Sequence, residues 1–193
     1  MITQPHIGRQ VSHFVRVDIG GIQAHFSEDR KYRYSLSVPF FGEAYRTKTV
    51  AVILKNPSSA DALKADKTVS NVEKTMYKTF SDVSYVEILN LFALRGTYPK
   101  DIMQAYDSGV NIIGNENDTV FREVLEKSDY IVLAWGGASP IRKSVYDERI
   151  DIVYAMINEL NTAYKLFRKA EKGSNNYPFH ACYWPDNTDF IEL

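Results

Sequence analysis

One apolar run constrains the fold of this chain more than any other feature. Residues 49–56 read TVAVILKN, a nearly continuous stretch rich in β-branched side chains. Such a run predicts a strand buried on both faces, as in a parallel sheet that is covered by helices. It ends in short polar residues around one proline, at positions 56–61 (NPSSAD). Side chains of this kind can cap a following helix or contact a ligand.

Two further segments repeat the pattern of an apolar run followed by polar or Gly-rich residues. Residues 86–89 (VEIL) run into Asn90, and residues 130–134 (YIVLA) run into Trp135. The carboxyl ends of the strands in an open α/β sheet are where ligands bind. We therefore expect Asn56, Asn90 and Trp135, together with His180, to line one cleft at that edge.

From Lys48 onward the sequence alternates between strand and helix patterns. Strands that are separated by helices predict a mostly parallel sheet with helices on both faces, a three-layer α/β/α fold. The expected helices lie near 60–65, near 71–80, from Pro99, over 116–126 and over 148–160, and a further strand lies over 162–167.

The N-terminal part predicts antiparallel β structure. Residues 13–19 alternate in polarity, and residues 22–26 can return after a Gly-Gly turn. Residues 30–36 (RKYRYSL) alternate basic or polar with aromatic or apolar side chains. This segment is either an edge strand with a solvated basic face, or a basic, aromatic lip beside a polyanion or a base.

Length and composition narrow the class of protein. The 193 residues, 45% hydrophobic and 24% charged, predict a single α/β domain over 1–193, with 1–47 as a β extension packed on the core. No apolar run is long enough to cross a bilayer, and the N-terminus lacks a signal-peptide pattern, which predicts a cytoplasmic protein. A net charge of −1 argues against a wide basic face for duplex nucleic acid.

Metal and cofactor chemistry have little support in the sequence. Cys182 is the single cysteine, and His6, His13 and His25 show no ligand spacing. The phosphate-loop, dinucleotide-binding and G-x-S-x-G motifs are also missing. We expect no bound transition metal and no cofactor. His180 draws attention because it follows a Gly/Asn-rich loop late in an α/β chain.

Each candidate side chain also has an ordinary structural interpretation. Ser58 or Ser59 is either a helix N-cap or a residue that faces a ligand, whereas Asn56 sits before a proline at a strand end. Asn90 is either a hydrogen-bonding partner of nearby backbone or part of a site. Arg95 is either a surface ion-pair residue or a rigid fork for phosphate.

The ordered set of motifs resembles the domain of unknown function (DUF) family 1643, found in bacteria and phages. The resemblance covers about residues 30–184, and Ala181-Cys182 departs from the family pattern, which looks like Pro-Leu there. The family name itself implies no activity. The matching segments are 30–36, 54–61, 66–68, 90–95 with Pro99, 117–118, 134–136 and 180–183.

A more distant resemblance is to the uracil-DNA glycosylase superfamily. In that superfamily an Asp-Pro or Asn-Pro motif positions a water, an Asn reads the base, and a late His loop completes the site. The matching positions are Asn56-Pro57, Asn90, Trp135-Gly136 and His180, whereas residues before Lys48 have no counterpart and Ala181 replaces the usual proline.

That resemblance implies a glycosylase-like hydrolase that acts on the N-glycosidic bond of a base in nucleic acid or of a nucleoside or nucleotide. It implies that Asn56 orients a water, assisted by Asp61 or Asp66, and that His180 donates to the leaving base. The expected partner is a nucleobase, a nucleotide or a single strand. The alternatives are a non-catalytic nucleotide or modified-base binding protein and an interaction scaffold. The implied substrate-binding residues are Pro57, Ser58, Ser59, Asn90, Phe92, Arg95, Trp135 and Gly136.

Overall fold

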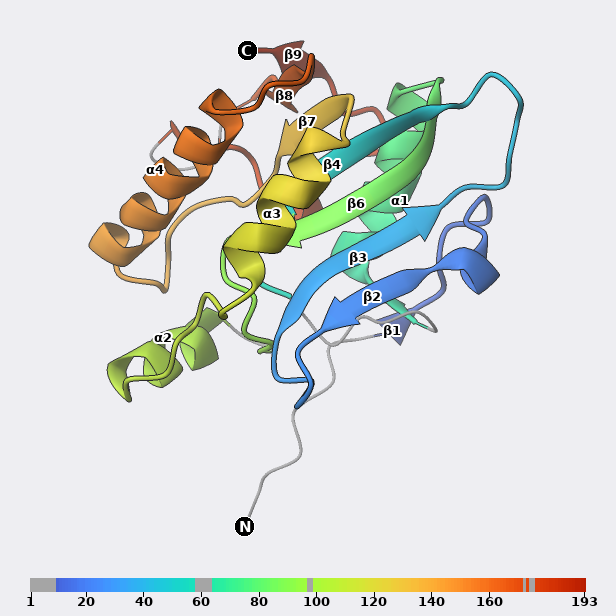
Figure 1. Cartoon of the computed structure of the whole chain (residues 1–193). Coiled ribbons are helices and arrows are strands. Elements are labelled where there is room, and N and C mark those ends of the chain that lie inside the picture. Colours follow the sequence, from blue (N-terminus) through green and yellow to red (C-terminus); the bar gives the residue numbers. More distant parts are fainter. Residues whose placement is uncertain (1–9, 58–63, 97–98, 172, 174–175) are drawn as a thin grey trace.

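The computed structural model describes residues 10–57, 64–96, 99–171, 173 and 176–193 (Figure 1). Its strands are β1 (Gln10–Val11), β2 (Gln23–Phe26), β3 (Arg33–Pro39), β4 (Lys48–Leu54), β5 (Ala65–Asp66), β6 (Val83–Asn90), β7 (Tyr130–Leu133), β8 (Lys165–Lys169) and β9 (Phe190–Glu192). Its helices are α1 (Lys67–Thr79), α2 (Pro99–Asp107), α3 (Asn117–Glu126) and α4 (Lys143–Asn158), with 3-10 turns η1 (Ile19–Gly21) and η3 (Ala181–Tyr183).

One mixed sheet of seven strands, in the order β2-β3-β6-β4-β7-β8-β9, forms the centre of the molecule. The four strands β6, β4, β7 and β8 pair in parallel. The pairs β2–β3, β3–β6 and β8–β9 are antiparallel. The expectation of a mostly parallel sheet therefore holds for the centre only. The N-terminal strands join the same sheet, because a short turn returns the chain from β2 to β3 without a crossover helix.

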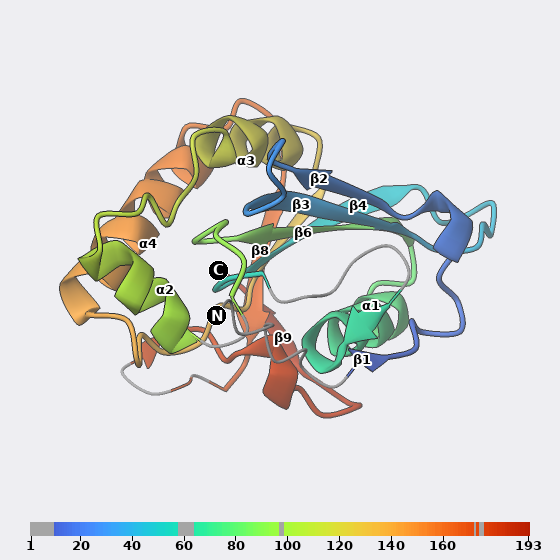
Figure 2. The ribbon, with the colours of Figure 1, turned by 90° about the horizontal axis from the view of Figure 1, so that it is seen from below.

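Helices cover both faces of the sheet (Figure 2). Alternate side chains of β4 divide the core into two clusters. Val50, Val52 and Leu54 pack with α1, whereas Ala51 and Ile53 pack with α3 and α4. The buried run at 49–56 thus forms the strand that the sequence predicts, between two helical layers.

Two N-terminal expectations are wrong. Residues 13–19 contain no strand, because His13 turns toward α1, where its Nδ1 lies 2.6 Å from Oε1 of Glu73. Residues 30–36 do not form an edge strand, since β3 lies between β2 and β6. Arg33 and Tyr34 are only 1% and 2% exposed, so the predicted solvated basic face does not exist there.

The helices agree with the sequence pattern in type and differ at their starts. α1 begins at Lys67 rather than near 71, because the side chain of Asp66 accepts a hydrogen bond from Val69 N at 2.8 Å. α4 begins at Lys143 rather than at 148, whereas α2 begins at Pro99 as predicted. The short helix expected near 60–65 falls mainly outside the described residues.

Candidate functional site

The carboxyl ends of β6, β4 and β7 lie side by side at the centre of the sheet. Leu54 pairs with Asn90 across β4 and β6, and Ala134 N donates to Ile53 O at 2.9 Å after β7. Neighbouring strands are about 4.8 Å apart, so the three ends fall within roughly 10 Å of one another. The late His loop joins them, because Ala181 N donates to Ala134 O at 3.4 Å.

Gly136 and His180 are in direct contact. Gly136 has a φ of +74°, and a Cβ at this position would lie 2.7 Å from Cβ of His180. Only glycine combines that backbone conformation with so close an approach. The two residues line a cavity of about 150 Å³ whose other walls are Gly137, Gly173, Phe179 and Tyr183.

The imidazole of His180 is held as a neutral N–H donor. Cys182 N donates to Nδ1 of His180 at 3.1 Å, so the neutral ring carries its proton on Nε2. Burial, together with the positive charge of Lys55, lowers the pKa of His180 from 6.5 to about 4. At neutral pH the ring therefore offers an uncharged Nε2–H group.

Lys55 is a buried cation that the sequence analysis missed. The residue is 7% exposed, and its Nζ donates to the carbonyl oxygens of Gly137 and Ser139. Nζ also lies 5.5 Å from the ring centroid of Tyr146. Burial lowers the pKa of Lys55 from 10.5 to about 8, which still leaves it protonated at pH 7. The available signal was a lysine at the end of an otherwise apolar strand.

Asn90 is a fully buried amide without a partner. Its exposure is 0%, and neither Nδ2 nor Oδ1 has a hydrogen-bond partner among the described residues. Its main-chain oxygen accepts a hydrogen bond from Nδ2 of Asn117 at 3.1 Å. A buried polar group left unpaired costs about 1–3 kcal/mol. Among the described residues the side chain of Asn90 therefore makes no hydrogen bond to nearby backbone, and its donor and acceptor are both unengaged.

Asn56 is oriented by the segment that follows β6. Its Nδ2 donates to Gly96 O at 3.3 Å and to Pro57 O at 3.4 Å, which leaves Oδ1 as its acceptor. Gly96 N in turn donates to Pro57 O at 3.3 Å. Ser58, Ser59 and Asp61 lie outside the described residues, so their predicted roles stay predictions.

The side chains at this edge occupy two faces of the sheet rather than one cleft. Asn90 lies two residues after Ile88 in β6, so the two share one face of the sheet, and Ile88 packs with α1 there. Ala181, next to His180, packs on this face as well. Trp135 and Phe92 are fully buried on the opposite face. Successive residues of a strand alternate between faces, which explains the separation.

Trp135 contributes to a different cavity on the α4 face. Its ring lies 5.8 Å from that of Tyr154 in an edge-to-face arrangement. The cavity, of about 260 Å³, is also lined by Asp147, Asp151 and Tyr177. Phe92 packs 6.1 Å from the ring of Tyr146 and lies in the core.

A buried arginine supports the turn after Asn90. Nε of Arg149 donates to Leu91 O at 2.7 Å, and its Nη2 lies 2.6 Å from Oδ1 of Asp118. Asn117 Nδ2 donates to the main-chain oxygens of Asn90 and Leu91. The sequence pattern indicates only a helix start at 117–118, and Arg149 escapes notice within an amphipathic helix.

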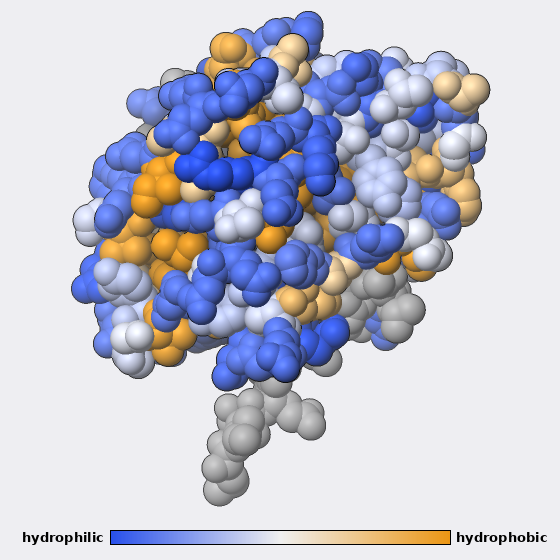
Figure 3. Space-filling model, in the orientation of Figure 1, coloured by the Kyte–Doolittle hydropathy of each residue, from blue (hydrophilic) through white to orange (hydrophobic). Residues whose placement is uncertain are grey.

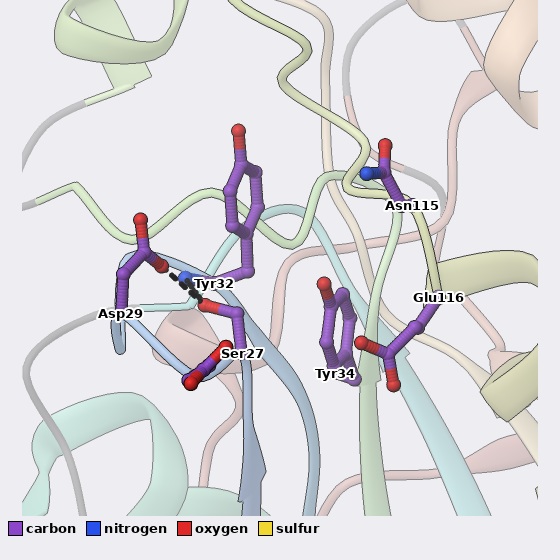
Figure 4. A pocket seen from close by; sticks show the side chains of 7 residues that line it. Ser27, Asp29, Tyr32, Tyr34, Asn115 and Glu116 are labelled. Atoms are coloured by element: carbon purple, nitrogen blue, oxygen red, sulfur yellow. Dashed lines mark hydrogen bonds between the residues drawn. The ribbon is translucent and has the colours of Figure 1, made fainter.

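The aromatic part of residues 30–36 faces an acidic hollow, not a basic one (Figure 4). Tyr32 and Tyr34 present parallel rings with centroids 6.3 Å apart. They line a hollow of about 460 Å³ with Glu28, Asp29 and Glu116, among others. The expected basic, aromatic lip is therefore absent from this face of the described residues.

Within the described part of the chain, no helix is both long and apolar enough to span a membrane. The same residues contain no group of three or more His, Cys, Asp or Glu side chains arranged to hold a metal ion.

Comparison with known families identifies the chain. Residues 33–180 match the family described as "Protein of unknown function (DUF1643)", and the chain belongs to this family. Searches of curated proteins and of solved structures give no match. The resemblance to the uracil-DNA glycosylase superfamily consequently has no support from these comparisons and remains a hypothesis.

Proposed function

We propose that this DUF1643 protein is a glycosylase-like hydrolase that cleaves the N-glycosidic bond of a base in nucleic acid or of a nucleoside or nucleotide. The observation that carries the proposal is the neutral His180, whose tautomer is fixed with the proton on Nε2 and which lies near the buried cation Lys55.

The reaction needs help at the departing base. When the C1′–N bond breaks, its electron pair stays on the base, which becomes anionic, while positive charge develops on the sugar. A preorganised N–H donor in a site shielded from water stabilises such an anion in the transition state. The Nε2–H group of His180 fits this role, and the positive charge of Lys55 acts in the same direction.

Two amides fit the other requirements of the reaction, which are a group that orients the attacking water and a group that recognises the base. Oδ1 of Asn56 remains to accept a hydrogen bond from the water that adds to C1′, and this water releases its proton to solvent. The buried amide of Asn90 offers one donor and one acceptor, a pair suited to reading the edge of a base. A base within a duplex would first have to leave the stack.

The test is release of free base from a panel of nucleosides, nucleotides and single-stranded oligonucleotides, followed by chromatography. Loss of one oxyanion donor costs about 3–4 kcal/mol, so His180→Ala should slow release roughly a hundred- to a thousandfold with little change in substrate binding. His25→Ala, on the exposed strand β2, serves as the matched control. If wild type releases no base from any substrate while it still binds one, the protein is the non-catalytic binder instead.

A second experiment asks why Asn90 is present. Because its amide is buried without a partner, Asn90→Leu should leave the free energy of unfolding unchanged or raise it by about 1–2 kcal/mol. The same variant should lose selectivity among bases. If Asn90→Leu unfolds more easily and keeps its base selectivity, Asn90 is structural.

A further inference from the structure

A hollow beside β3 combines aromatic side chains with an acidic rim (Figure 4). It lies between the turn that joins β2 to β3, at residues 27–29, and the segment before α3, at Asn115 and Glu116. Its volume of about 460 Å³ exceeds that of the cavities at Trp135 and His180, and it falls in the range of small-molecule sites, roughly 300–1,000 Å³. The hollow shares no lining residue with the cavity at His180, so it is a separate candidate site.

The two tyrosines of the hollow are held in fixed positions. The rings of Tyr32 and Tyr34 are parallel to within 5°. Gly114, with a φ of +89°, packs against both, since a Cβ there would lie 2.9 Å from Cδ1 of Tyr32 and 2.9 Å from Cε1 of Tyr34. The hydroxyl of Tyr32 donates to Asn111 O at 2.7 Å. A ligand that meets these rings therefore loses little binding free energy in ordering them.

Tyr34 presents a hydroxyl to the hollow although its ring is buried. The residue is 2% exposed, and its hydroxyl points into the space between the labelled side chains of Figure 4. The main chain of Glu116 is hydrogen-bonded to the phenol oxygen, whereas no described residue accepts its O–H proton. Burial raises the pKa of Tyr34, and the negative charges of Glu116 and Asp29 raise it further. A buried hydroxyl with spare hydrogen-bonding capacity indicates an unfilled position for a polar ligand.

Negative charge dominates the rim of the hollow. The rim has three carboxylates, on Glu28, Asp29 and Glu116. Asp29 pairs with Lys31 at 2.8 Å, and Glu116 lies 3.6 Å from Nε2 of His25, which is a cation only when protonated. Glu28 is exposed and forms no ion pair with another described residue. The rim therefore attracts cations, most strongly at low ionic strength.

The arrangement suits an organic cation rather than a metal ion. Figure 4 shows the carboxylates of Asp29 and Glu116 on opposite sides of the two tyrosines. A metal ion needs several oxygen ligands within about 2.0–2.6 Å, and no group of three or more acidic, His or Cys side chains within the described ranges is arranged to hold one. An alkyl chain between two ammonium groups matches carboxylates that are separated by aromatic rings, since ammonium groups and the methylenes beside them pack on aromatic surface.

We propose that the hollow binds a diamine or polyamine, with one ammonium group at Glu28, a second at Glu116, and the alkyl chain against Tyr32 and above the hydroxyl of Tyr34. The pair between Asp29 and Lys31 is exposed and therefore weak, so it leaves the negative field of the rim in place. The ligand is defined by two positive charges on one flexible chain. Its binding does not depend on the proposed hydrolysis of a base, because the two sites share no residue.

Titrations followed by ¹H–¹⁵N NMR test the site in the full chain. The probes are 1,4-diaminobutane, spermidine, n-butylamine and MgCl₂, at constant low ionic strength. The diamine should shift the amide signals of residues 27–34 and 114–116. It should bind about three- to fivefold more tightly than n-butylamine, because it forms one further exposed ion pair. Spermidine should bind at least as tightly as the diamine, and Mg²⁺ more weakly.

Exchange of the rim carboxylates should remove the preference for two charges. In Glu116→Gln and in Glu28→Gln the diamine should bind about three- to fivefold more weakly than in wild type, and no better than n-butylamine. Glu126→Gln removes the same charge at an exposed position at the other end of α3, and it should match wild type. Tyr32→Leu should weaken both amines about two- to fivefold through loss of the cation–π contact. Tyr32→Phe keeps the ring without the hydrogen bond to Asn111, and it should bind like wild type.

The outcomes separate this site from the hydrolase. Absence of diamine binding, equal affinities for the diamine and n-butylamine, or Mg²⁺ that binds as tightly as the diamine each overturns the site. A loss in Glu126→Gln as large as that in Glu116→Gln also overturns it, because the binding would then be diffuse charge screening. A preference for the diamine that Glu28→Gln and Glu116→Gln both abolish supports the site, whether or not the protein releases any base. Base release without diamine binding supports the hydrolase and removes this site.

Discussion

Helix α1 holds two histidine segments in different ways. Through Glu73 it binds His13 directly, with 2.6 Å between Oε1 and Nδ1. Through Asn71 it holds the turn that follows His180, since Nδ2 donates to the main-chain oxygens of Ala181 and Cys182. Glu73 and Asn71 are two residues apart on this helix. The carboxylate of Glu73 binds an imidazole ring, whereas the amide of Asn71 binds only the main chain next to one.

The difference lies in what surrounds each ring. The ring of His13 meets a carboxylate that also accepts from Phe14 N at 2.8 Å, so this region joins the N-terminal segment to the helix. The charge of the buried cation Lys55 acts on the ring of His180, and no described residue accepts a hydrogen bond from its Nε2–H group. We infer that the first histidine serves stability and that the second is placed for chemistry.

Removal of the carboxylate should have the largest effect. Glu73→Ala leaves the side chain of His13 and the amide of Phe14 without their buried partner, at a cost of about 3–5 kcal/mol in the free energy of unfolding. Urea denaturation measures this loss, and Glu126→Ala, at an exposed position on α3, is the control. Base release per folded molecule should not change. A loss below about 1 kcal/mol would mean that this pair contributes little to stability.

The pH dependence of stability should reveal the second histidine. Because the pKa of His180 falls from 6.5 to about 4 on folding, the unfolded chain binds the extra proton between these values. The contribution of the neutral His180 to the free energy of unfolding is therefore fully present above pH 6.5. It is lost as the pH falls toward 4, which lowers the free energy of unfolding by up to about 3 kcal/mol. Urea unfolding at pH 7 and pH 4 should show this extra loss in wild type and not in His180→Ala. Equal losses would contradict a pKa of His180 that is lowered on folding.

The contact between Gly136 and His180 offers a smaller test with an internal control. An alanine at 136 would meet Cβ of His180 at 2.7 Å in a left-handed backbone conformation, whereas a Cβ at Gly137 meets nothing within 4 Å. Gly136→Ala should cost about 1–2 kcal/mol and displace His180, with a matching fall in base release. Gly137→Ala should leave the free energy of unfolding near that of wild type. Similar stabilities for the two variants would argue against the close approach.

The mildest change concerns the support of the His180 turn. Asn71→Ala removes the hydrogen bonds to Ala181 O and Cys182 O and should cost about 1 kcal/mol. Amide hydrogen exchange should accelerate at Tyr183, whose N–H donates to His180 O at 3.0 Å. The exposed Asn187→Ala is the control. Unchanged exchange at Tyr183 would mean that Asn71 does not hold the turn.

The sequence predicts the central part of the fold well because local patterns decide it. The apolar run at 49–56 forms β4, and the strands near 86 and 130 become its two neighbours. The ends of the sheet escape prediction, because pairing direction depends on how distant segments meet. Arg33 illustrates the difficulty: its sequence surroundings indicate a solvated strand, yet β2 covers that position from the outside.

The sequence predicts where the candidate site lies better than it predicts which side chains form it. Asn56, Asn90 and Gly136 reach the same edge because parallel strands end there, and the hydrogen bond from Ala181 N to Ala134 O brings the His180 loop to it. Trp135 lies on the other face because successive residues of a strand alternate between faces. A difference of one residue in where the strand ends would place its side chain on the opposite face. Lys55 and Arg149 act through partners far away in the sequence, so no local pattern marks them.

The two attachments on α1 also bear on how fast the chain folds. His13 and Glu73 are 60 positions apart, and Asn71 and Ala181 are 110 positions apart. Contacts between residues so distant in sequence slow folding, because a long loop must close before they form. During synthesis the sheet centre can collapse once β7 has emerged, whereas the pocket at His180 waits for almost the whole chain. A nascent chain therefore acquires its core before it acquires any capacity to bind a ligand at His180.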